Sequence, residues 1–149
     1  MTNKKKLLIG TFLIFLFLAI YAASLNGKKT FWGNYEAVSG PGKEVRIEIL
    51  QEGSGELAVK TGDRIMINYI AASADGTTLE SNLGNEEPLS MLVGSADIIK
   101  GWNEGLIGMR VGERRKITVP PELAYGKIGR ATVPPDATII FEVILLEIM

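Results

Sequence analysis

The chain has 149 residues, of which 46% are hydrophobic, enough for one domain with its own core and hardly enough for two. It contains no histidine and no cysteine, which excludes an imidazole base, a thiolate nucleophile and the usual ligand sets of zinc and most other transition metals. Residues 1–29 hold five lysines and no acid, whereas the remainder carries 11 basic and 17 acidic residues. An acidic body without a basic stripe argues against a nucleic-acid partner. We expect no metal and no cofactor, and a reaction that needs neither a strong base nor a nucleophile.

Residues 1–29 have the pattern of an N-terminal signal-anchor or signal peptide. Lys4, Lys5 and Lys6 precede a strongly apolar stretch, Leu7–Ala23, whose 17 residues lie between the lengths typical of a cleaved signal and of a membrane span. Ala22-Ala23-Ser24 could serve as a cleavage site, but the aromatic residues just beyond it, Phe31, Trp32 and Tyr35, favour a retained anchor at a membrane interface. We expect a single-pass membrane protein with its domain outside the cytoplasm; the alternative is a secreted or periplasmic protein after cleavage.

Residues 30–44 read as a linker, because "AVSGPGKE" places two glycines and a proline in a row of four. From residue 45 to 149, most segments alternate apolar and polar residues over 5–10 positions between turn formers, as strands do. In chain order these segments are "VRIEIL", "RIMINYI", "TTLES", "LSMLVG", "RRKITVP" and "TIIFEVILLEI". In the first of them Val45, Ile47 and Ile49 alternate with Arg46 and Glu48. Short turns between separate strands predict an antiparallel sheet.

One segment repeats at a helical period. Ile98, Ile99, Trp102 and Leu106 share one face between about Asp97 and Ile107, and Gly108 is a plausible left-handed stop. Glycines at positions 101 and 105 each cost about 1 kcal/mol in a helix, so we expect the helix to lie very close to neighbouring backbone. These elements predict an α+β domain in which the helix covers one face of a curved sheet. From its spacing alone, Trp102 would be an ordinary core residue.

A basic segment, "RVGERRK" at residues 110–116, follows the helix, and Glu113 interrupts its four basic residues. We interpret it as a solvated turn and the start of a strand.

Four features of residues 45–149 together resemble the FK506-binding protein family of peptidyl-prolyl isomerases. They are "GDRIMINYIAASADGTTLES", "LVGSADIIKGWNEGLIGMRVGERRKITVPPELAYG", "VPPDATIIFEV" and the order that links them. The resemblance implies a five- or six-stranded curved antiparallel sheet wrapped around one short helix. It also implies a hydrophobic cleft that binds an X-Pro segment and accelerates its cis/trans isomerisation. That reaction breaks no covalent bond, since its barrier of about 18–20 kcal/mol is rotation about a partial double bond.

The resemblance also assigns the residues of this cleft. It implies catalytic roles for Tyr69, Glu80, Trp102, Tyr125 and Phe141, with Trp102 as the floor and Tyr125 as the donor to a ligand carbonyl. It implies substrate contacts for Leu79, Leu89, Met91, Ile98, Ile99 and Val133, and backbone groups of Ile99 that face a ligand. Four of these residues, Tyr69, Trp102, Tyr125 and Phe141, are the four aromatic residues between positions 45 and 149.

Some positions depart from the family pattern. Leu79, Leu89 and Met91 stand where aromatic residues are typical, and Glu80 replaces an aspartate beside Tyr69. The loop from Gly126 to Val133, which overhangs the cleft in this family, is one residue shorter than its commonest form. Because rigid aromatic walls contribute much of the buried area, we expect low to moderate efficiency and weak binding of macrolide inhibitors.

Three functions follow from these features. The first is a membrane-tethered isomerase acting on proline bonds of exported, folding polypeptides. The second is a non-catalytic chaperone or assembly module that holds peptide segments in the same cleft, which the missing aromatic residues motivate. The third is a structural membrane component that uses only the outer surface of the fold.

Overall fold

Each segment expected to be a strand is a strand in the computed structural model, which describes residues 43–84 and 87–149. The elements are β1 (Arg46–Gln51), β2 (Arg64–Ser73), β3 (Thr78–Ser81), β4 (Leu89–Leu92), α2 (Lys100–Gly105), β5 (Arg114–Val119), the 3₁₀ turn η1 (Pro121–Leu123) and β6 (Ile139–Ile148). The predicted signal-anchor lies outside the described residues. None of the helices in the described ranges has both the length and the apolar character needed to cross a bilayer.

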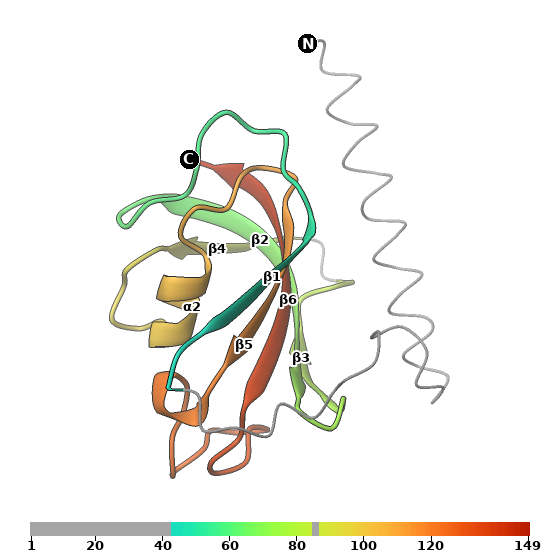
Figure 1. Ribbon diagram of the computed structural model, residues 1–149, viewed down its shortest axis with the longest axis vertical. Helices are drawn as coiled ribbons and strands as arrows, with labels where there is room; N and C mark the ends of the chain where they lie inside the picture. Colours follow the sequence, from blue (N-terminus) through green and yellow to red (C-terminus); the bar gives the residue numbers. More distant parts are fainter. Residues whose placement is uncertain (1–42, 85–86) are drawn as a thin grey trace. The chain divides into compact units, whose positions relative to one another are not determined.

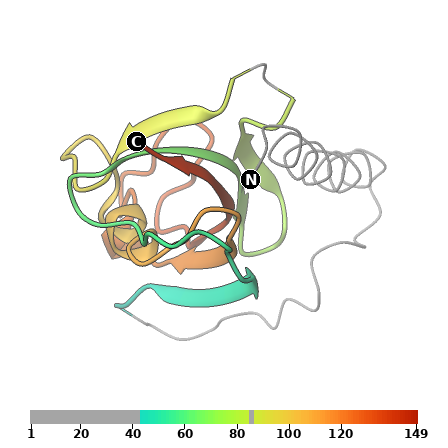
Figure 2. The same ribbon diagram turned by 90° about the horizontal axis from the view of Figure 1, so that it is seen from above.

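The six strands form one antiparallel sheet in the order β1-β5-β6-β2-β3, and β4 also pairs with β2. The long strand β2 has two partners in succession along one edge: β4 beside Arg64–Ile67, and β3 beside Ile70–Ala72. Figures 1 and 2 show the sheet curving around α2, from β4 through β2 and β6 to β5 and β1. The predicted sheet wrapped around one short helix is therefore confirmed.

The core fills the concave side of the sheet. Alternate residues of β2, β5 and β6, among them Ile67, Ile117 and Val143, are fully buried there. Strand β1 differs from its predicted alternation, because all six of its residues are exposed, with Ile47 at 44% and Ile49 at 48%. Within the described residues it lies at one end of the sheet order and pairs only with β5, so its inward face has no second layer to cover it.

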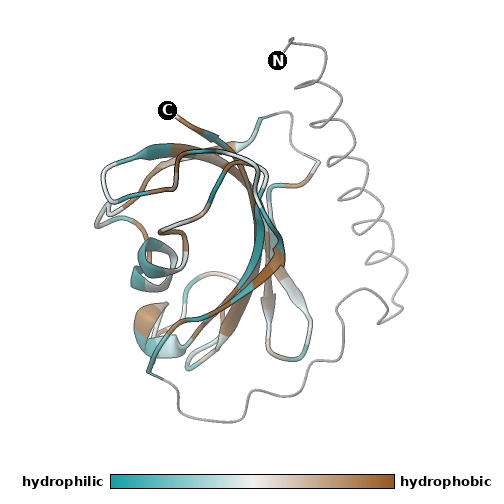
Figure 3. Cartoon of the chain, turned by 45° about the horizontal axis from the view of Figure 1, so that its top comes forward, coloured by the Kyte–Doolittle hydropathy of each residue, from teal (hydrophilic) through white to brown (hydrophobic). Residues whose placement is uncertain are grey.

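Helix α2 is shorter than its apolar pattern suggested. It runs only from Lys100 to Gly105, with Ile99 as its N-cap and Leu106 as its C-cap. Figure 3 shows mostly hydrophilic colours on α2, and its buried residues are Trp102 and the two glycines. The expected stop at Gly108 does have a left-handed backbone, with φ of 79°.

The two glycines bring α2 against β5. A Cβ atom at Gly101 would lie 2.2 Å from Val119 Cγ1, and one at Gly105 would lie 2.5 Å from Ile117 Cγ2. The expected close approach is present, although the atoms it meets belong to side chains rather than to backbone. The helix axis, and with it Trp102, is positioned by this contact.

A buried ion pair holds the C-terminal end of α2 and corrects the interpretation of residues 110–116 as solvated. Arg115 and Glu113 are only 5% and 3% exposed, and the Arg115 Nε atom donates to Glu113 Oε1 at 2.7 Å. Arg115 Nη1 donates to the carbonyl oxygens of Gly105 and Ile107 at 2.7 and 2.9 Å. These bonds satisfy carbonyls that the end of a helix leaves without partners, so Arg115 ties α2 to β5.

Candidate active site

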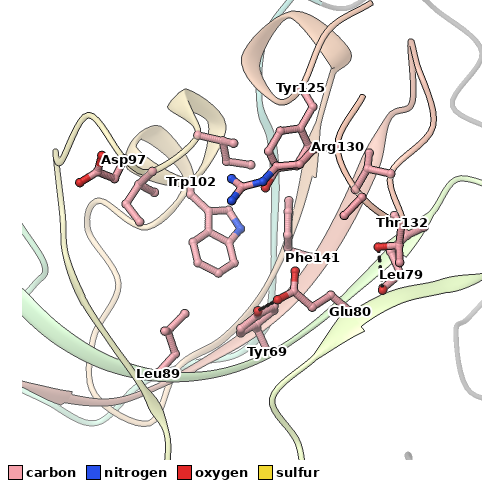
Figure 4. A pocket seen from close by; sticks show the side chains of 14 residues that line it. Tyr69, Leu79, Glu80, Leu89, Asp97, Trp102, Tyr125, Arg130, Thr132 and Phe141 are labelled. Carbon is pink, nitrogen blue, oxygen red and sulfur yellow. Dashed lines mark hydrogen bonds between the residues drawn. The ribbon is translucent and has the colours of Figure 1, made fainter. Parts of the chain in front are cut away.

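A cleft of about 630 Å³ opens between β2, β3, β4, the segment before α2 and the loop that follows η1. Figure 4 shows side chains from these elements around it. Most of its lining is aromatic or aliphatic, with three charged groups. The lining residues are Tyr69, Leu79, Glu80, Leu89, Asp97, Ile98, Ile99, Trp102, Tyr125, Arg130, Ala131, Thr132, Val133 and Phe141.

The floor of the cleft is an aromatic cluster centred on Trp102. The rings of Tyr69 and Phe141 each lie 5.0 Å from the indole, edge to face at 87° and 67°. Trp102 is 6% exposed, and it belongs both to the buried core and to the lining of the cleft. Edge-to-face contacts of this kind fix ring orientation, which gives the floor a defined shape.

A hydrogen bond from strand β2 to strand β3 orients one wall. The Tyr69 hydroxyl donates to Glu80 Oε1 at 2.9 Å, the contact that the resemblance implied despite the longer side chain. Burial, and then this bond to a carboxylate, raise the pKa of the Tyr69 hydroxyl well above its usual value. Tyr69 is therefore protonated at neutral pH, and its hydroxyl proton lies in the hydrogen bond to Glu80.

The strand that carries Tyr69 is itself held by a buried amide. Asn82 Oδ1 accepts from the Tyr69 backbone nitrogen at 2.8 Å, and Asn82 Nδ2 donates to the Ile67 carbonyl oxygen at 3.1 Å. Asn82 is 7% exposed, and it bonds to β2 where the chain leaves β3. These bonds fix the part of β2 from which the Tyr69 ring projects.

Three hydrogen-bond donors at the cleft have no acceptor among the described residues. One is the Tyr125 hydroxyl, another is the Ile99 backbone amide, and the third is the buried indole nitrogen of Trp102. The Ile99 carbonyl, in contrast, accepts from the amides of Trp102 and Asn103 at 3.1 and 3.3 Å. An apolar cleft with a few unused donors can bind and orient the carbonyl groups of an extended peptide.

Ten of the eleven predicted site residues line the cleft, including all five to which a catalytic role was assigned. Met91 does not. It lies on the same face of β4 as Leu89, but it is 5% exposed and packs in the core, opposite Ile65 of β2. Alternation places both residues on the inner face, and only the end of the strand nearer the cleft contributes to the lining.

Four lining residues were not predicted: Asp97, Arg130, Ala131 and Thr132. Three of them belong to the loop after Tyr125. The family resemblance implied that this loop overhangs the cleft, but a loop has no period from which inward-facing positions can be predicted. Thr132 Oγ1 donates to the Leu79 carbonyl oxygen at 3.2 Å, which joins the loop to β3 across the mouth of the cleft.

Comparison with known proteins identifies this arrangement. Residues 55–146 match the family model of the FKBP-type peptidyl-prolyl cis-trans isomerases. The chain belongs to that family. A relative named FK506-binding protein, from Neisseria meningitidis serogroup B, is 46% identical over 103 residues, which cover 68% of this chain and 94% of the relative. The prediction of an FKBP-type peptidyl-prolyl isomerase is therefore confirmed.

Two longer relatives of this FKBP-type chain cover a similar share of it. The mouse protein named peptidyl-prolyl cis-trans isomerase FKBP14 is 42% identical over 112 residues, covering 72% of this chain and 53% of the relative. The crystal structure of FkpA from Escherichia coli superimposes with a TM-score of 0.64 at 36% identity, covering 70% of this chain and 47% of that one. This chain therefore spans about half the length of each of these two relatives.

Proposed function

We propose that this FKBP-type isomerase catalyses rotation about X-Pro bonds of exported polypeptides, outside the cytoplasm and tethered to a membrane by residues 1–29. The isomerase activity itself follows from family membership. Support for the location comes from the sequence alone: three lysines precede an apolar stretch of 17 residues, and a linker separates that stretch from the domain.

The observation that carries the catalytic proposal is the convergence of Tyr69, Trp102, Tyr125 and Phe141 on one cleft. A prolyl ring is apolar and flat enough to lie against the indole of Trp102. The Tyr125 hydroxyl and the Ile99 amide, which have no acceptor among the described residues, then bind carbonyl groups of the same peptide. The polypeptide is held at several points, while its imide bond lies in the least polar part of the site.

Rotation is accelerated when the twisted imide binds more strongly than the planar one. Twisting removes amide resonance, so the carbonyl becomes less polar and loses less by leaving water. Aromatic walls therefore favour the twisted form relative to the planar form. No proton has to be transferred, which agrees with the commitment of the Tyr69 proton to Glu80.

The test is catalysed cis/trans exchange of a proline tetrapeptide by the full-length chain in detergent. Tyr125→Phe combined with Trp102→Leu should remove most of the acceleration, because the carbonyl donor and the floor are both lost. Lys127→Gln, a change at an exposed residue outside the cleft lining, is the matched control. Absence of acceleration by the intact chain would contradict the catalytic proposal.

A second candidate is a peptide-binding chaperone without catalysis, which aliphatic walls at Leu79 and Leu89 would suit. Binding of an unfolded, proline-containing protein without faster exchange would favour it.

Location is tested separately, by alkaline extraction of membranes followed by sizing of the protein. Release of a shortened chain into the soluble fraction would contradict the tether.

A further inference from the structure

The loop after Tyr125 places positive charge at the mouth of an otherwise apolar cleft. Residues 126–133 contain Lys127 and Arg130 and no acid, although residues 30–149 as a whole carry 11 basic and 17 acidic residues. Both side chains are exposed, but Arg130 lines the cleft and Lys127 does not. The charge at the mouth of the cleft is therefore opposite in sign to the net charge of residues 30–149.

The backbone of Arg130 is held in one place. Its amide donates to the Val133 carbonyl oxygen at 2.9 Å, and the Val133 amide donates back to the Arg130 carbonyl oxygen at 2.7 Å. Gly129, with φ of 69°, allows this tight turn, because an added Cβ would lie 2.5 Å from the Val133 carbonyl oxygen. The bond from Thr132 to Leu79 fixes the other side of the turn. Arg130 therefore extends from a fixed base.

The guanidinium group of Arg130 stacks on the ring of Tyr125, the residue whose hydroxyl can bind the substrate carbonyl. Its Cζ atom lies 5.7 Å from the centre of the Tyr125 ring, within the range of cation–π attraction. In the view of Figure 4 the group projects from Tyr125 towards the indole of Trp102. This stacking keeps the charge beside Tyr125 at the mouth of the cleft.

No carboxylate among residues 43–84 and 87–149 forms an ion pair with Arg130. Of the two acids that line the cleft, Glu80 accepts the Tyr69 hydroxyl, and Asp97 lies on the far side of Trp102 from Tyr125. The guanidinium fork, which can bind both oxygens of a carboxylate, is available to a ligand.

We propose that Arg130 is a specificity-determining residue that favours substrates with an acidic residue immediately before the proline. The inference rests on the proposed function. If the Tyr125 hydroxyl holds the carbonyl of the residue that precedes proline, the side chain of that residue lies beside Tyr125. Arg130 occupies that place, so a Glu or Asp side chain meets the guanidinium and a Lys side chain is repelled by it.

The experiment compares tetrapeptides that differ only before the proline. The exchange catalysed by the full-length chain in detergent is measured at low salt with Glu-Pro, the isosteric Gln-Pro, Lys-Pro and Leu-Pro. We expect kcat/KM to be about fivefold higher for Glu-Pro than for Gln-Pro, as for a partly exposed ion pair, and lower again for Lys-Pro. The Glu/Gln ratio should approach one at about 0.5 M salt.

Variants separate Arg130 from the general charge of the loop. Arg130→Gln should bring the ratio of kcat/KM for Glu-Pro to that for Gln-Pro to about one. Arg130→Glu should bring that ratio below one and make Lys-Pro a better substrate than Glu-Pro. Lys127→Gln removes the same charge from the same loop outside the cleft and should keep the wild-type ratio. A loss of the ratio in Lys127→Gln equal to that in Arg130→Gln would overturn the assignment to Arg130.

Other outcomes distinguish this inference from the proposed function. Normal turnover of Leu-Pro with a Glu/Gln ratio of one or less refutes the inference and leaves the isomerase intact. If no peptide is turned over, the catalytic proposal fails. The Arg130 inference is then decided by the affinities of fluorescently labelled Glu-Pro and Gln-Pro peptides, and equal affinities overturn it.

Discussion

Replacement of Gly101 by alanine tests how the cleft floor is positioned. The substitution adds one methyl group on the face of α2 that contacts β5, where it would lie 2.2 Å from Val119 Cγ1 and 2.8 Å from Cγ2. Valine is stiff about χ1 and occupies staggered rotamers. Both methyl groups lie at the contact, so any staggered rotation leaves at least one of them there. The clash can be relieved only by moving the helix away from the strand.

Two effects of opposite sign determine the size of the change. Alanine is favoured over glycine in a helix by about 1 kcal/mol. An extra methyl group forced into a packed core costs about 1–3 kcal/mol, and this contact belongs to the upper end because no rotamer clears it. We therefore expect Gly101→Ala to lower the free energy of unfolding by about 2 kcal/mol.

The free energy of unfolding is measured by urea denaturation of the detergent-solubilised chain in a Trp32→Phe background, so that fluorescence reports Trp102. Glu104→Ala, at an exposed position of the same helix, is the control and should change stability by no more than about 0.5 kcal/mol. Equal or greater stability of Gly101→Ala would refute the reasoning, because helix propensity would then outweigh the contact.

A double-mutant cycle makes the test specific. Val119→Ala removes the two methyl groups that oppose Gly101 and should cost about 2–3 kcal/mol by itself. In the double variant, the methyl group introduced by Gly101→Ala occupies part of the vacated space. The double variant should therefore be more stable than the sum of the single effects predicts, by about 2 kcal/mol. Additive effects would show that the two residues do not meet.

Three further changes test separate parts of the structure. Tyr69→Phe should lower the unfolding free energy by about 1 kcal/mol at pH 8 through loss of the bond to Glu80. Burial raises the pKa of Tyr69 above that of an unfolded tyrosine, so the stabilisation by the Tyr69 hydroxyl is present below about pH 10 and falls above it. Between about pH 9 and 11, Tyr69→Phe should therefore lose less unfolding free energy than the wild type in urea titrations. An equal loss in the two proteins would contradict the assignment. Leu79→Phe should tighten FK506 binding about three- to tenfold in a fluorescence titration, whereas unchanged affinity would show that this wall does not contact the macrolide. Arg115→Ala should lower the unfolding free energy by about 3–5 kcal/mol because Glu113 keeps a buried charge without its partner; a loss under about 1 kcal/mol would argue that the pair is not buried in solution.

The strands could be predicted because each carries its own period. All six alternating segments form strands, and the long apolar segment "TIIFEVILLEI" became β6, which pairs with both β2 and β5. Alternation does not predict whether an inward-facing residue lies in the core or at the cleft. Met91 and Leu89 have the same parity on β4, yet the first packs in the core and the second lines the cleft. That difference depends on where β4 ends relative to β2 and the cleft.

Charged residues were the least predictable, because their environment is set by partners distant in sequence. The sequence around Arg115 is typical of a solvated strand residue, and nothing in it indicates that the side chain bonds to the carbonyl groups of Gly105 and Ile107 at the end of the helix. Arg130 lies in a loop with no period, and only the turn to Val133 brings it back over Tyr125. In both cases the guanidinium group belongs to a contact that forms only after the elements have packed.

The contacts that place Trp102 lie on the side of α2 opposite the cleft. Gly101 and Gly105 set the distance between α2 and β5, and Arg115 holds the end of the helix. None of these three residues lines the cleft, yet a shift of the helix moves the indole relative to Tyr69. A change at Gly101 should therefore reduce catalysis as well as stability, and the loss of kcat/KM should persist at temperatures where the variant is fully folded. Adding Val119→Ala should then recover the kcat/KM that Gly101→Ala loses and cancel the destabilisation caused by Gly101→Ala, although the cost of Val119→Ala itself remains.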